Sequence, residues 1–171
     1  IFQVGRTELQ PDRYGNQKVL DEIMAGVEKL RGMEKYQFSG VEINGFASPE
    51  GGLELNTRLG QKRAERLQEY IQSQMPDLTS DDFILINGVE NWDGLRRLVE
   101  ASDMEYKEEV LRVLDIPLEQ GRKRELMNLE GGKPYRYMLK TFYPELRNAC
   151  YISLIYDELT DRGADAINAA V

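Results

Sequence analysis

Histidine is absent from this chain of 171 residues, and cysteine occurs once, at Cys150. Triads of the Ser-His-Asp type need histidine as the general base, and the common zinc sites are built from histidine and cysteine. The composition therefore excludes His-based triads, Cys/His nucleophile pairs, the usual zinc constellations and an internal disulfide. The sequence also has no Walker-type or dinucleotide-type glycine loop. We expect no enzymatic activity, no metal site and no cofactor.

Basic residues are outnumbered by acidic ones, and long apolar runs are absent. Thirty acidic residues against 22 basic ones give a formal net charge of -8. Such a charge repels the phosphate backbone of nucleic acids and anionic membrane surfaces. No stretch approaches the roughly 18 apolar residues of a membrane-spanning helix. We therefore expect no nucleic-acid partner and no transmembrane segment in this chain. Because the sequence starts at Ile1 and runs directly into a strand-like pattern, we expect it to be part of a larger protein.

What the chain does contain is an alternation of strand and helix patterns. Period-two runs predict strands, and apolar residues recurring at three and four predict amphipathic helices. The strands are expected at residues 2–9, 38–45, 83–89 and 149–156, the helices at residues 17–32 and 56–75, and a run of short helices at residues 92–143. This order predicts one α/β domain over residues 1–158, in which helices cover a sheet. The remaining residues, 159–171, are expected to form a loosely ordered tail.

One charged residue falls on a row that should be buried. Arg63 stands between Leu59 and Leu67 in an i, i+4 ladder that continues to Ile71. A buried guanidinium needs a partner. It can tie down loop carbonyls or pair with a local carboxylate, or it can close a pocket under the neighbouring glycine-containing loop and bind a ligand carboxylate. The spacing alone leaves both interpretations open.

A longer motif surrounds this arginine. A strand ends in Gly45, Phe46, Ala47 and Ser48, and Gly51, Asn56, Leu59, Arg63 and Ala64 follow at fixed spacing. This segment resembles the core motif of the OmpA C-terminal, Pal and MotB superfamily. The opening segment and Arg147 are similar to the same family, so the resemblance covers most of residues 1–90 and 145–157. It implies an OmpA-like β-α-β-α-β-β fold, with residues 92–143 as a helical insertion of about fifty residues before the last strand.

The family also implies a function. In such domains a strand-end Asp and the helix Arg clamp the zwitterionic end of diaminopimelate in the peptidoglycan stem peptide. Arg63 matches that arginine, and Ser48 stands where the Asp is usual. The resemblance implies a pocket formed by Ser48, Glu50, Asn56, Arg63 and Arg147, with Glu50 or Glu54 supplying the carboxylate. The expected protein is a non-enzymatic periplasmic domain that tethers an outer-membrane-associated protein of a Gram-negative cell to peptidoglycan.

An alternative interpretation keeps the fold and changes the partner. The Ala-Ser-Pro-Glu-Gly loop and the helical stretch near Trp92 resemble a subgroup attached to outer-membrane and surface-fibre proteins. In that case the chain is an interaction or assembly domain, and the peptidoglycan pocket is vestigial. The aromatic residues of the helical stretch either form its core or line a carbohydrate or protein contact surface: Trp92, Tyr135, Tyr137, Phe142 and Tyr143. The basic cluster Arg122, Lys123 and Arg124 is expected to face solvent.

Overall fold

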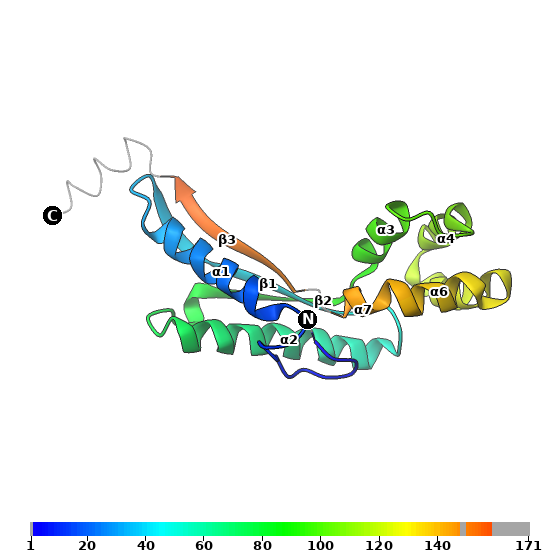
Figure 1. Cartoon of the computed structure of the whole chain (residues 1–171), viewed down its shortest axis with the longest axis horizontal. Coiled ribbons are helices and arrows are strands. Elements are labelled where there is room, and N and C mark those ends of the chain that lie inside the picture. Colours follow the sequence, from blue (N-terminus) through cyan, green and yellow to red (C-terminus); the bar gives the residue numbers. More distant parts are fainter. Residues whose placement is uncertain (1, 148–149, 159–171) are drawn as a thin grey trace.

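A computed structural model describes residues 2–147 and 150–158 of the chain (Figure 1). Strand β1 (Tyr36–Ala47) is the central strand of the sheet, whose order is β2-β1-β3. It pairs in parallel with β2 (Phe83–Glu90) and antiparallel with β3 (Cys150–Glu158). The mixed α/β class predicted from the alternation of patterns is confirmed.

Helices α1 (Asn16–Arg31) and α2 (Leu53–Gln74) cover the face of the sheet that carries Val41 and Ile43. Both of these strand residues are completely buried. The helices contribute their apolar rows to the same core, namely Leu20 and Val27 from α1 and Ala64, Leu67 and Ile71 from α2. Burial of these side chains removes apolar surface from water and is the main source of stability for the α/β part of the fold.

The strand predicted at residues 2–9 is wrong. Residues 2–15 form turns and irregular structure, with a turn closed by a hydrogen bond from Arg6 N to Gln3 O at 3.0 Å. Gly5 within this turn has a φ of 61°, a conformation that interrupts an extended strand. Phe2 is buried against the guanidinium of Arg63 instead of lying in a sheet. The expected β-α-β-α-β-β order thus lacks its first strand in the described residues.

A run of short helices joins β2 to β3. Its elements are α3 (Trp92–Glu100), α4 (Lys107–Leu114), α5 (Arg122–Asn128), α6 (Lys133–Thr141) and α7 (Tyr143–Leu146), with 3-10 turns η2 (Leu118–Gln120) and η3 (Leu129–Gly132); a further turn, η1 (Ser80–Asp82), precedes β2. These helices enclose a second hydrophobic core that includes Leu95, Val99, Val110, Leu126 and Met138. The tail predicted at residues 159–171 lies outside the described residues.

The helical run gathers beyond the end of the sheet where β1 and β2 finish, as Figure 1 shows. The loop after β1, the last residue of β2 and the first turn of α2 therefore face α5, α6 and α7 across one junction. None of the described helices has the length and apolarity needed to cross a membrane.

Candidate functional site

Two glycines bring the start of α2 against the end of β1. A Cβ atom at Gly45 would lie 2.1 Å from the carbonyl oxygen of Gly60, and a Cβ atom at Gly60 would lie 2.9 Å from the carbonyl oxygen of Gly45. Neither position has room for a side chain, because real Cβ atoms do not approach this closely. This close contact between helix and strand fixes where the loop of residues 48–52 crosses the end of the sheet.

Asn56 holds that loop in place from the first turn of α2. Its buried amide nitrogen Nδ2 donates to Ser48 O at 3.2 Å, to Glu50 O at 2.8 Å and to Glu90 Oε1 at 2.5 Å. The hydroxyl of Ser48, also buried, donates to Glu50 Oε1 at 3.1 Å. The loop is therefore ordered by hydrogen bonds from Asn56 to its main chain and by one between its own Ser48 and Glu50 side chains.

The carboxylate of Glu50 forms the most polar point of the junction. Arg147 donates to it through Nε, 2.6 Å from Oε1, and through Nη2, 3.0 Å from Oε2. The side chain of Arg147 is 18% exposed and that of Glu50 is 23% exposed. This is the fork-to-fork geometry in which a guanidinium recognises a carboxylate most strongly. The pair joins the residue that follows α7 to the loop after β1.

Glu90 is a second carboxylate at the same junction, and the sequence did not single it out. Its side chain is only 2% exposed, and it accepts hydrogen bonds from Trp92 Nε1 at 3.0 Å and from the ammonium of Lys123. Lys123 also donates to Gly51 O at 2.9 Å. The solvent-facing position predicted for Lys123 is wrong, because its ammonium is held by Glu90 and by Gly51 O. Both partners lie far away in the sequence. Arg122 stacks over the Trp92 ring, with 4.9 Å between Cζ and the ring centroid, whereas Arg124 is exposed as expected.

Arg63 is enclosed, and it does not join the Glu50 carboxylate. The residue is 1% exposed, and its guanidinium donates to Phe46 O at 2.9 Å, Arg6 O at 3.2 Å and Gln3 O at 3.3 Å. The ring of Phe2 lies 5.3 Å from Cζ. Of the two interpretations that the sequence left open, these contacts agree with the one in which the buried arginine binds loop carbonyls. Residues 2–6 would have to move before a ligand carboxylate could reach Arg63.

The structure thus brings four of the five predicted site residues together: Ser48, Glu50, Asn56 and Arg147. Arg63 is not part of this network, because its guanidinium is enclosed by the carbonyls of Phe46, Arg6 and Gln3. The motif could not reveal Glu90 or Lys123. A single acidic residue at the end of a strand carries no distinctive pattern, and the same holds for a single lysine in a short helix. In the described part of the chain, no three His, Cys, Asp or Glu side chains are grouped so as to hold a metal ion.

Two hollows border this junction. One, of about 220 Å³, is lined by Pro49, Trp92, Lys123, Tyr135 and Tyr143, among others. The other, of about 500 Å³, lies beside Leu53, Leu118 and Arg124. Gly51 and Lys123 line both, so the two hollows meet at the Glu50 loop. Burial raises the pKa of Tyr143 and of Tyr135, and the charge of Glu50 adds to both shifts.

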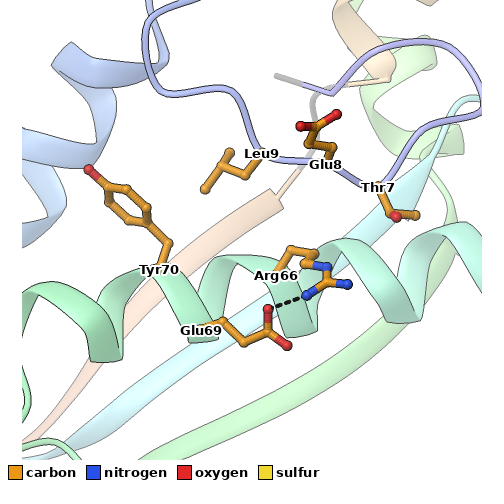
Figure 2. Close-up of a pocket in the computed structure, with 6 residues that line it drawn as sticks. All are labelled: Thr7, Glu8, Leu9, Arg66, Glu69 and Tyr70. Carbon is orange, nitrogen blue, oxygen red and sulfur yellow. Dashed lines mark hydrogen bonds and ion pairs between the residues drawn. The ribbon is translucent and has the colours of Figure 1, made fainter.

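A third hollow, of about 410 Å³, lies between residues 7–9 and α2 (Figure 2). Its charged groups on the helix, Arg66 and Glu69, pair with each other at 2.6 Å and are half-exposed. A solvent-exposed ion pair of this kind contributes little to binding or stability. The region around the Glu50 loop is the stronger candidate site, because the charged side chains of Glu50, Arg147 and Glu90 there are largely buried.

No protein-family model matches the chain, and no curated protein matches its sequence.

Proposed function

We propose that this chain is a non-enzymatic domain that binds the peptidoglycan stem peptide at Glu50 and Arg147. It would thereby tether an outer-membrane-associated protein to the cell wall from the periplasm. The observation that carries the proposal is the largely buried, bidentate Glu50–Arg147 pair on a loop whose sequence resembles the ligand loop of OmpA-like domains. This proposal moves the carboxylate anchor from Arg63, where the resemblance placed it, to Arg147.

A zwitterion is the natural ligand of such a pair. Its ammonium can bind the Glu50 carboxylate while its carboxylate binds the Arg147 guanidinium, so that two charge-assisted contacts replace one. The free end of diaminopimelate carries both groups on one carbon. Asn56 and Ser48 keep the loop and the Glu50 side chain ordered before the ligand arrives. Such ordering lowers the entropic cost of binding.

Co-sedimentation of the full chain with purified diaminopimelate-type sacculi tests the proposal. We expect the wild-type chain to sediment with the sacculi and Glu50→Gln to remain in solution. Glu54→Gln is the matched control, because Glu54 lies four residues away and pairs only loosely with Arg58 at 3.4 Å. Equal sedimentation of wild type and Glu50→Gln, or none of the wild type, would contradict the proposal.

A second function is favoured by a different observation. Arg63, which matches the family's ligand-binding arginine, is enclosed by the chain's own carbonyls and Phe2. These contacts fit an interaction or assembly domain of an outer-membrane or surface-fibre system in which the old pocket is filled by internal contacts. In that case the wild-type chain would fail to sediment with sacculi, and its helical run would be the surface that contacts the partner.

A further inference from the structure

The smaller hollow beside the Glu50 loop has aromatic walls. Trp92 from α3, Tyr135 from α6 and Tyr143 from α7 line it, together with Pro49 and Met127. Tyr135 and Tyr143 pack edge to face with their ring centroids 5.9 Å apart. The indole of Trp92 is fixed by its hydrogen bond to Glu90 and by the guanidinium of Arg122. The walls are therefore held in place by contacts with one another and with Glu90 and Arg122.

The hollow also presents polar groups. Two of the three N–H donors of the Lys123 ammonium are directed to Gly51 O and Glu90. Among the described residues this leaves one donor for a ligand oxygen. Pro49 and Gly51, the neighbours of Glu50 in the chain, both line the hollow. Aromatic faces and a few convergent polar groups thus occur in one concave site, the usual composition of a small-molecule pocket.

The chemistry of these walls selects among ligands. A purely apolar side chain would leave the third N–H donor of the Lys123 ammonium without an acceptor, which costs free energy. A simple ion would leave the aromatic faces unused. A pyranose ring satisfies both, since its C–H faces pack on aromatic rings while its hydroxyl and acetamido oxygens accept hydrogen bonds. The volume of about 220 Å³ is below that of pockets for drug-sized ligands and suits a single ring.

We infer that this hollow binds an N-acetylated amino-sugar ring, so that the domain contacts the glycan strand of peptidoglycan as well as its stem peptide. The inference rests on the proposed function, because the glycan is expected here only if the stem peptide binds at the adjacent Glu50–Arg147 pair. The helical run would then supply specificity for the polymer that the α/β part alone lacks.

Trp92 provides a direct readout, because it is the only tryptophan of the chain. Titration of the full chain with N-acetylglucosamine tetramer is expected to change the Trp92 emission in a saturable way. Glucose tetramer, which lacks the acetamido group, serves as the control sugar and is expected to leave the emission unchanged. An unchanged emission with N-acetylglucosamine tetramer would overturn the inference.

Two tyrosines on α6 form a matched pair of variants. Tyr135 lines the hollow, whereas Tyr137 does not line it and packs against Phe142, with 5.5 Å between the ring centroids. We expect Tyr135→Leu to weaken binding of N-acetylglucosamine tetramer by about tenfold, the order of one lost aromatic contact. Tyr137→Leu should bind as wild type does. Tyr135→Phe keeps the ring and should retain most of the affinity, which separates loss of stacking from loss of folding.

The two sites can fail separately. Binding of a stem tripeptide ending in diaminopimelate is expected to survive Tyr135→Leu, because the tripeptide has no sugar. Tripeptide binding without tetramer binding would overturn the glycan inference and leave the stem-peptide proposal standing. Equal loss of tetramer affinity in the Tyr135→Leu and Tyr137→Leu variants would also overturn it.

Discussion

Arg147 and Glu50 lie 97 residues apart in the chain and are joined by two hydrogen bonds of 2.6 and 3.0 Å. The contact links the end of the helical run to the loop after β1. Because both side chains are less than a quarter exposed, water screens their attraction only partly. The pair therefore does two things at once: it closes the junction in the free protein, and it presents both charges that a zwitterionic ligand needs.

The Glu90–Lys123 pair should be essential for stability. Glu90→Gln removes the negative charge and leaves the Lys123 ammonium beside a neutral amide, so we expect the free energy of unfolding to fall by about 2 kcal/mol. This figure is below the roughly 3–5 kcal/mol of a fully buried pair because Lys123 is 27% exposed. Urea denaturation measures it. Glu65→Gln is the control, since the exposed Lys62–Glu65 pair should contribute little. Equal effects of the two substitutions would contradict this prediction.

The contact between Gly45 and Gly60 should tolerate no side chain. Gly45→Ala would push a methyl group against the α2 main chain, and we expect a loss of about 1–3 kcal/mol in the free energy of unfolding, as for other overpacked positions. Gly52→Ala meets no atom within 4 Å and has an ordinary φ of -81°, so it should change stability by less than about 1 kcal/mol. Thermal or urea denaturation of both variants measures the two changes in the free energy of unfolding. A stable Gly45→Ala protein would show that α2 can move away from β1.

Sequence patterns predicted local features correctly and missed features that depend on contacts between distant parts of the chain. The row Leu59, Arg63, Leu67 and Ile71 was predicted to be buried, and all four side chains are. That prediction needed only helical periodicity, which is a local property. The prediction of a first strand failed because Phe2 and Val4 alternate as in a strand, whereas the segment is held by a hydrogen bond from Arg63 to Arg6 O, 57 residues away. The partners of Lys123 were missed for the same reason: its contacts with Glu90 and Gly51 join segments that no short-range pattern relates.

The site was predictable only in part. The loop motif led to Glu50, Ser48 and Asn56, which the structure places in one network. It could not show that Arg147 would take the Glu50 carboxylate and that Arg63 would turn to main-chain carbonyls. Both outcomes depend on where the N-terminal segment and the end of α7 pack. Of the aromatic residues of the helical run, Phe142 and Tyr143 are buried in its core, whereas Trp92 and Tyr135 pack against that core and are partly exposed. The contact role predicted for these residues stays a prediction.

Arg63 is expected to act on the N-terminal segment. A lysine ammonium cannot span the carbonyls of Gln3, Arg6 and Phe46, so Arg63→Lys should lower the free energy of unfolding by about 1–3 kcal/mol. Amide hydrogen exchange in residues 2–7 should become faster, while stem-peptide binding per folded molecule stays unchanged. Arg66→Lys, on the same helix but half-exposed, is the control. Loss of peptide binding with unaltered exchange would return the anchor to Arg63.

Tyr143 should make the protein sensitive to alkali. Burial raises the pKa of its phenol, whereas the unfolded chain ionises it near its ordinary pKa of about 10. Its contribution to stability is therefore fully present below about pH 10 and is lost as the pH rises above that value. Urea denaturation at about pH 8 and about pH 11 should show a larger loss for wild type than for Tyr143→Phe. Identical losses would contradict the prediction.

The central claim is that Glu50 and Arg147 exchange their mutual contact for a zwitterion, and isothermal titration of the full chain with two stem tripeptides tests it most directly. One tripeptide ends in diaminopimelate, and the other ends in lysine, which keeps the side-chain ammonium but lacks the neighbouring carboxylate. We predict that the diaminopimelate tripeptide binds at least about tenfold more tightly, a difference of about 1.4 kcal/mol, and that Arg147→Gln, which removes the partner of the extra carboxylate, abolishes this preference. Equal affinity for the two tripeptides, or a preference that survives Arg147→Gln, would contradict the account.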